Sequence, residues 1–191
     1  YFHDKPFNRD NYEKVCAENG QPFLGSYNIQ LYNLITDHHD TACHYVSKNV
    51  DPSTFDIYFG EIGAVDPQPV ENFFGTKMNA DISTTSELRY ADIFAGDYPI
   101  INVVNKARVA EDTHAVIIKD SFVNAITMML AENYAQTTFI DIRHLKDLTL
   151  YDYLADADAD TVMVLYNNGR LLLELYNFDG NYTNLIEVED K

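Results

Sequence analysis

The sequence has 191 residues, of which 46% are hydrophobic and 13% aromatic, a composition that supports one folded domain with a substantial core and excludes a disordered chain. Its 13 basic and 30 acidic side chains give a net charge of −17, which repels phosphate backbones and anionic lipid and argues against nucleic-acid or membrane-surface binding. No apolar run is long enough to span a bilayer, and no signal peptide is recognised. Because the chain begins at Tyr1 rather than methionine, we expect a processed product or a fragment.

The first quarter of the chain is predicted to contain a short helix and one strand. Tyr12, Val15 and Cys16 recur at helical spacing, and Asn19-Gly20 follows as a stop signal. The segment 28–37 is predicted to be a strand that ends at a cluster of histidines, and the segment after it, 41–48, is weakly helical.

The two cysteines, Cys16 and Cys43, lie far apart and have no CxxC spacing, so we expect neither a disulfide framework nor a zinc knuckle. Prolines, glycines and aspartates then interrupt every periodicity over residues 49–110. This stretch is interpreted as an irregular excursion with a few short strands or helices.

From residue 114 onward, apolar strand-length runs alternate with helical patterns. Strands are predicted at 114–120, 137–143 and 161–167, and helices at 121–134 and 149–156. The first helix carries an apolar stripe of Phe122, Ile126, Met129, Leu130 and Tyr134, and the second begins with Thr149 as its cap, three residues before Asp152. This alternation predicts a parallel sheet buried on both faces, with a β-hairpin around Asp179-Gly180 appended at the end.

Ser121 is the first candidate for catalysis because it stands where the strand 114–120 ends and a helix begins. Its backbone N–H and those of its neighbours are expected to be unpaired there, and they would stabilise a tetrahedral oxyanion during acyl transfer. The alternative is structural, since Asp120 or Ser121 would also serve as the cap of the helix.

The decapeptide ITDHHDTACH, residues 35–44, concentrates three of the six histidines of the chain. At a strand-to-loop corner Asp37 could orient His39 as a general base for Ser121. A zinc site would use the pairs His39 with Cys43 and Asp40 with His44, yet no second histidine or cysteine cluster completes the shell. A solvated polar loop is the remaining alternative.

The acidic run DADAD, residues 156–160, does not match a calcium-binding loop of the EF-hand type. Its sixth position is Thr161 rather than glycine, and its twelfth is Asn167 rather than glutamate. We therefore expect a charged loop between helix and strand, and no metal site or cofactor anywhere in the chain.

Three segments together resemble a known family. YNLITDHHD (32–40) looks like a TDHHW signature, VENFFGT (70–76) is similar to a midsection motif, and the block from VIIKDSF through TVMVLYN (161–167) follows element by element. On these motifs the chain resembles the DHHW family, a branch of the SGNH-hydrolase-like superfamily related to the bacterial alginate O-acetylation proteins. The resemblance covers about residues 20–167.

The resemblance implies an SGNH-like (flavodoxin-like) α/β domain over residues 1–191, with a mostly parallel sheet flanked by helices. Part of the N-terminal portion usual in such domains is expected to be missing, or the fold to be reduced. The order of motifs, with the Asp-x-His pair before the serine, is the permuted one.

By the same resemblance, Ser121 is the nucleophile of a DSF motif that also contains Asp120, His39 is the base, and Asp37 is its orienting carboxylate. Arg143 occupies a position that borders the site, or else pairs with a buried aspartate.

Asp40 stands where the signature has tryptophan, which removes an aromatic wall and puts an extra carboxylate beside the proposed base. Candidates for the remaining oxyanion donors are Asn124, Asn167 and Gly75. The implied function is an acyl-ester hydrolase or O-acetyltransferase outside the cytoplasm, acting on an acetylated polysaccharide or another acyl ester. The alternative is a catalytically degenerate module that binds glycan or serves as a scaffold.

Overall fold

The computed structural model describes residues 8–18, 22–23, 34, 40–60, 66–70, 90–94, 96–145 and 148–167. The chain divides into two compact units, Tyr1–Asp56 with Gln68–Gly96, and Ile57–Pro67 with Asp97–Lys191. The interpretation of residues 1–191 as one SGNH-like domain stays a prediction. The predicted strand 28–37, apart from Leu34, and the C-terminal hairpin lie outside the described residues.

Two short antiparallel pairs form the described part of the first unit. Strand β1 (Tyr12–Cys16) pairs with β4 (Cys43–Ser47), and β2 (Pro22–Phe23) pairs with β3 (Asp40–Thr41). The unit also contains the 3₁₀ helices η1 (Arg9–Asn11) and η2 (Pro52–Thr54) and a single helical turn, α3 (Tyr90–Ile93). The predicted helix near residue 12 and the weakly helical segment 41–48 are therefore wrong, because strand pairing holds both segments extended.

A disulfide joins β1 to β4 at the end of their ladder. Cys16 lies directly opposite Cys43 in the register, with their Cα atoms 4.0 Å apart. This corrects the expectation that the cysteines would not be bridged, which relied on their separation along the chain. Antiparallel pairing brings together residues that lie 27 positions apart.

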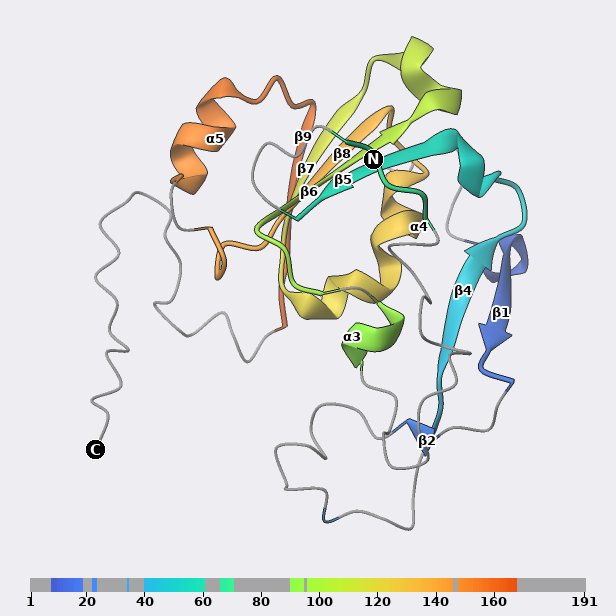
Figure 1. Ribbon diagram of the computed structural model, residues 1–191. Helices are drawn as coiled ribbons and strands as arrows, with labels where there is room; N and C mark the ends of the chain where they lie inside the picture. The colour runs from blue at the N-terminus through green and yellow to red at the C-terminus, as the bar shows by residue number, and fades with distance from the viewer. Residues whose placement is uncertain are drawn as a thin grey trace, which may run out of the picture. The chain divides into compact units, whose positions relative to one another are not determined.

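The second unit is built on a five-stranded sheet with the order β5-β6-β8-β7-β9 (Figure 1). The strands are β5 (Phe55–Phe59), β6 (Ile100–Asn105), β7 (His114–Lys119), β8 (Gln136–Ile140) and β9 (Thr161–Leu165). β7 runs parallel to both β8 and β9, whereas β6 is antiparallel to β8. The sheet is therefore mixed, and three of its strands confirm those predicted from residue 114 onward.

β6 lies inside the stretch that was interpreted as irregular. It begins directly after Pro99. Four of its six residues are buried, and the other two, Asn102 and Val104, are half-buried. β6 thus lies between β5 and β8 and runs antiparallel to β8. The predicted parallel sheet did not contain this strand.

Two helices cover opposite faces of this sheet (Figure 1). On one face Val116, Ile118 and Ile140 pack in an apolar cluster with Leu150 of α5 (Leu150–Asp156). The predicted cap of this helix is confirmed, because the Thr149 hydroxyl accepts a hydrogen bond from the Asp152 amide at 3.0 Å. The alternate side chains of β6, β7 and β8 point to the other face, toward α4 (Thr127–Ala131).

The helical segment after β7 differs from the predicted one. It begins as a 3₁₀ helix, η4 (Ser121–Ile126), and only then continues as α4. A 3₁₀ turn has three residues rather than 3.6, so the predicted stripe is rotated: Phe122 and Ile126 are 58% and 40% exposed. Leu130 and Tyr134 of the predicted stripe are buried, which confirms that part of it. The other buried residues of η4 and α4 are Val123, Asn124, Thr127 and Ala131.

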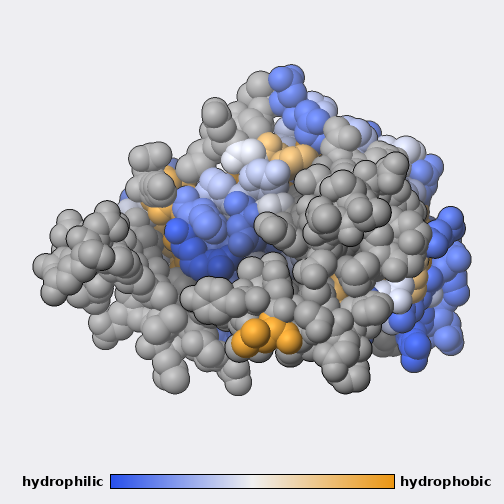
Figure 2. Space-filling view, turned by 60° about the horizontal axis from the view of Figure 1, so that its bottom comes forward, coloured by the Kyte–Doolittle hydropathy of each residue, from blue (hydrophilic) through white to orange (hydrophobic). Residues whose placement is uncertain are grey.

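Hydrophilic areas are broad on the face of the molecule that Figure 2 presents, with smaller hydrophobic groups among the described side chains. Within the part of the chain that the structure describes, no helix has the length and apolar character needed to cross a membrane. The large exposed hydrophobic side chains come from several elements: Leu34, Tyr45, Val109, Phe122, Ile126, Tyr151, Val162 and Val164.

Two valines that lie side by side in register on neighbouring strands offer a matched test of the packing. Val116 of β7 is 0% exposed and pairs in register with Val162 of β9, which is 50% exposed. We expect Val116→Ala to lower the free energy of unfolding by about 2 kcal/mol, because two buried methyl groups are lost and a cavity remains. Val162→Ala should cost less than about 0.5 kcal/mol in the same urea titration. Equal costs would contradict the described burial.

The disulfide gives a second prediction. Removing the cross-link with Cys16→Ser and Cys43→Ser together should lower the free energy of unfolding of the first unit by about 2–4 kcal/mol, since the unfolded chain regains the entropy of an open loop. Maleimide labelling followed by mass spectrometry should detect no free thiol until the native protein is reduced. Labelling without reductant would show that the bond does not form.

Candidate active site

The candidate site lies in the second unit, at one edge of its sheet. β7 and β8 are parallel, so their carboxyl ends meet at the same edge, and the antiparallel strand β6 begins there. Three segments that are distant in the sequence therefore converge. One starts at Asp97 and leads into β6, the second runs from Lys119 at the end of β7 to Asn124, and the third follows β8 from Asp141 to His144.

Ser121 is the first residue of η4 and is half-buried. The residue before it, Asp120, is buried and caps the helix: one carboxylate oxygen accepts from the Phe122 amide and the other from the Asn167 amide, both at 3.0 Å. The Val123 amide donates to the Asp120 carbonyl at 3.2 Å. The capping role of Asp120 is confirmed, and the expectation that the neighbouring amides would be unpaired is wrong for Phe122 and Val123.

Lys119 is a charged side chain buried beneath this turn. It is 0% exposed, and its Nζ donates to Oδ1 of Asn124 at 2.6 Å and lies 3.9 Å from Oδ2 of Asp141. Burial lowers the pKa of Lys119, and the nearby Asp141 carboxylate opposes that shift. The ammonium group thus depends on these partners to remain charged away from water.

Asn124 is equally buried, and both ends of its amide are engaged. The oxygen accepts from Lys119, and Nδ2 donates to Oδ1 of Asp97 at 3.1 Å. Asn124 was an expected oxyanion donor; its described contacts are with the buried Lys119 and the exposed Asp97. Asn167 contributes its backbone amide to Asp120.

Arg143 holds two aspartates at the same edge. Its Nε donates to Oδ1 of Asp141 at 2.8 Å, and its Nη2 donates both to the other oxygen of Asp141 and to Oδ2 of Asp97 at 3.2 Å. Asp141 is completely buried. The hydrogen bonds that Arg143 makes with the Asp141 carboxylate raise the pKa of Arg143 above its ordinary value, so the guanidinium stays charged. The alternative reading of Arg143, an ion pair with a buried aspartate, is confirmed.

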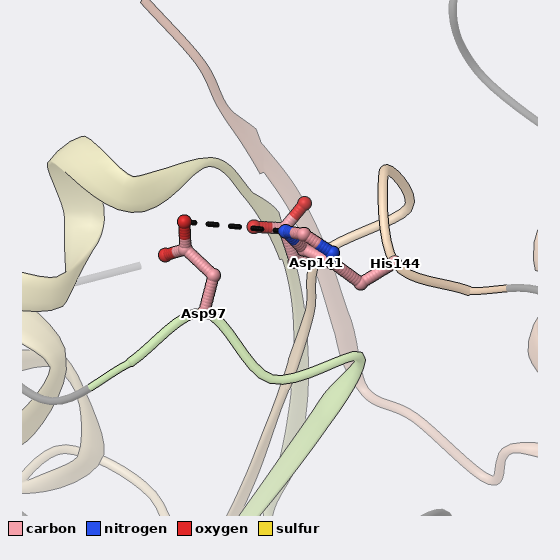
Figure 3. Close-up of side chains that lie close together, drawn as sticks. All are labelled: Asp97, Asp141 and His144. Atoms are coloured by element: carbon pink, nitrogen blue, oxygen red, sulfur yellow. Dashed lines mark ion pairs between the residues drawn. The ribbon is translucent and has the colours of Figure 1, made fainter.

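Asp97, Asp141 and His144 could in principle present ligands to a cation. One ligand atom of each lies within 4.8 Å of the others, and His144 Nε2 is 4.0 Å from Asp97 (Figure 3). However, Arg143 already binds both oxygens of Asp141 and one of Asp97. A divalent ion would be repelled by this fixed guanidinium and by Lys119. The charges favour an ion-pair network over a metal centre here.

The other predicted site residues lie elsewhere. Asp37, His39 and Gly75 are outside the described residues. Asp40 is described: it is exposed and pairs with Phe23 between β3 and β2, in the first unit.

Sequence reasoning did not single out Lys119, Asp97 or Asp141. One signal was present, a lysine that ends an otherwise apolar buried strand, VIIK. The DADAD run is the loop between α5 and β9, as expected, and its Asp160 carboxylate accepts from the His114 amide at 2.8 Å.

Comparisons with known proteins identify the fold but no family. No protein-family model matches the chain, and no curated protein matches it. The structure of Bacillus cereus PatB1 is similar, with a TM-score of 0.71 and 25% identity over 91% of this chain and 54% of that one. A structure of Bacillus cereus PatB1 with a sulfonyl adduct gives a TM-score of 0.68 and 21% identity, over 91% and 52% of the two chains.

A third solved structure is a DHHW family protein from Eubacterium siraeum. Its TM-score is 0.57 and its identity 18%, over 83% of this chain and 48% of that one. The chain therefore has the α/β fold of a DHHW family protein over most of its length. It spans about half the length of each of these solved structures.

The fork of Arg143 gives a third prediction. Arg143→Lys should lower the free energy of unfolding by about 2 kcal/mol, because an ammonium cannot bind both oxygens of buried Asp141 and also Asp97. The matched control is Arg108→Lys: Nη1 of Arg108 donates to both carboxylate oxygens of Glu111, and these side chains are 31% and 49% exposed, so a change below about 0.5 kcal/mol is expected. Similar losses for the two variants would contradict the difference in burial.

Proposed function

We propose that the protein is an SGNH-type acyl-ester hydrolase or O-acetyltransferase that acts on an acetylated glycan, and that it is a member of the DHHW family. Ser121 is the nucleophile, His39 the general base and Asp37 the carboxylate that orients it. The observation that carries this proposal is the position of Ser121, at the turn between β7 and η4, on an edge where buried charges and caps converge.

In the proposed reaction, Ser121 Oγ attacks the carbonyl carbon of an acetyl ester while His39 takes the hydroxyl proton. The tetrahedral oxyanion is stabilised by backbone N–H donors that include that of Ser121. When the intermediate collapses, His39 returns the proton to the departing sugar oxygen, which leaves an acetyl-serine. Water or a second sugar hydroxyl then attacks this ester, and His39 again removes and returns one proton.

The sulfonyl adduct of Bacillus cereus PatB1 supports a nucleophile on this fold. A sulfonyl group becomes attached to a protein when a nucleophilic atom attacks its sulfur, and acyl transfer needs the same kind of activated atom. The sequence motif around Ser121 makes its hydroxyl the matching atom in this chain.

The disulfide supports a location outside the cytoplasm. Cys16–Cys43 persists only where thiols are not kept reduced, as in secreted or membrane-anchored proteins. An acetylated polysaccharide is a substrate that would be met in that compartment.

One observation favours the second candidate function, a degenerate module that binds glycan without turnover. Asp40 replaces the tryptophan of the family signature next to His39. A carboxylate beside the proposed base would raise the pKa of His39 and keep more of it protonated at neutral pH.

Hydrolysis of 4-nitrophenyl acetate tests the two functions. Ser121→Ala and His39→Ala should each reduce kcat/KM by about 10³-fold or more, because a serine without its base is a weak nucleophile. Ser53→Ala, at an exposed serine of η2, is the matched control and should retain the wild-type rate. Phenylmethylsulfonyl fluoride should attach to the wild type with loss of fluoride, and not to Ser121→Ala. Equal rates in all four proteins would leave the binding module as the better assignment.

A further inference from the structure

Five side chains from the segments next to Ser121 form a closed ring of hydrogen bonds and ion pairs, here called the charge ring. Its members, in order of contact, are Lys119, Asn124, Asp97, Arg143 and Asp141, and the contact from Asp141 back to Lys119 closes it. Lys119, Asn124 and Asp141 are buried, Arg143 is half-buried and Asp97 is exposed. Two cations and two carboxylates balance, with one neutral amide between them. No charge in the ring is left without an opposite partner, which is the condition under which buried ions are tolerated.

The charge ring flanks Ser121 on both sides along the chain. Lys119 lies two residues before it and Asn124 three residues after it, and the ring ties them to the segments before β6 and after β8. Asp120 adds a tie to the end of β9 through the Asn167 amide. The turn that carries Ser121 is thus attached to the ends of four different strands.

We infer that the charge ring is a positioning device for Ser121, with Asn124 as the residue that couples η4 to the buried charges. This inference rests on the proposed function. Asn124 suits the task because its two ends differ: Lys119 requires an acceptor, and Asp97 requires a donor. The amide can satisfy both in one orientation, and this fixes where η4 starts relative to the sheet.

A substitution at Asn124 that keeps its shape should disturb this coupling. Asn124→Asp replaces the donor that faces Asp97 by a second acceptor, so two carboxylates meet without a proton between them. Asp97→Asn leaves Asn124 a partner but removes one charge from the ring. A misplacement of Ser121 by about 1 Å is enough to cost about 10²-fold in rate.

The two substitutions together restore every contact with the roles exchanged. The new carboxylate at position 124 accepts from Lys119 and from the new amide at position 97. The oxygen of that amide accepts from Arg143, and the ring again has two positive and two negative charges. Only the long contact of Asp97 with His144 is weakened.

The experiment compares kcat and KM for 4-nitrophenyl acetate in wild type, Asn124→Asp, Asp97→Asn and the exchanged double variant. Each single variant should lose about 10²-fold in kcat with KM changed by less than about threefold, and the double variant should recover to within about tenfold of wild type. Asn133→Asp is the matched control: Asn133 follows α4 and its amide donates to the Met129 and Leu130 carbonyls of that helix, outside the ring, so kcat should stay within about twofold.

Single variants as active as wild type, or a double variant no better than either single, would overturn the inference. Hydrogen exchange at the Phe122 and Val123 amides gives a readout that does not depend on catalysis. It should accelerate in the single variants and return to the wild-type rate in the double variant, with β7 and β8 amides unchanged. If this exchange pattern is observed but no activity depends on Ser121, the proposed function has failed and the charge ring has not.

Discussion

A lysine buried at the end of a sheet strand is the constraint on which the candidate site depends. Moving an ammonium group out of water costs several kcal/mol, and Lys119 recovers that cost only if its partners are in place. Those partners come from η4 and from the end of β8, and through them Arg143 and Asp97 are required as well. The convergence of three chain segments at one sheet edge is therefore a condition for burying this one charge.

One face of the sheet is apolar, whereas the other ends in charged side chains next to the candidate site. The face under α5 is an apolar cluster in which Val116, Ile118 and Ile140 meet Leu150. The face under η4 and α4 carries the same strands' alternate side chains, and at its carboxyl edge these become Lys119 and Asp141. An apolar face tolerates substitution of similar volume, whereas removing one partner from a set of paired charges leaves a buried charge uncompensated. The residues beside Ser121 are therefore held by contacts that single substitutions would disturb.

Local pattern was sufficient wherever an element is specified by its own residues. β7 and β9 are largely apolar runs, β8 combines two threonines with Phe139 and Ile140, and α5 carries its cap in Thr149, so each was predicted. The local pattern was misleading for β1, because Tyr12, Val15 and Cys16 have helical spacing. The strand is defined by its pairing with β4 and by the disulfide from Cys16 to Cys43, 27 positions later. Long-range pairing leaves no trace in a single stretch of sequence. A few short strands were expected within 49–110, and β6 is one of them, but its antiparallel place beside β8 depends on such pairing.

The site shows the same limit at the level of side chains. The cap at Asp120 was predicted, and an ion pair of Arg143 with some buried aspartate was one of two alternatives. Neither Asp141 nor Asp97, which is 46 residues from Arg143, was identified as that partner. Replacement of buried ion pairs by apolar residues of similar volume is often neutral or stabilising, so stability alone does not require charges at this edge. What an apolar contact cannot supply is direction: the hydrogen bonds of Asp120 and Asn124 restrict where η4 begins, and the proposed nucleophile Ser121 would need such accurate placement.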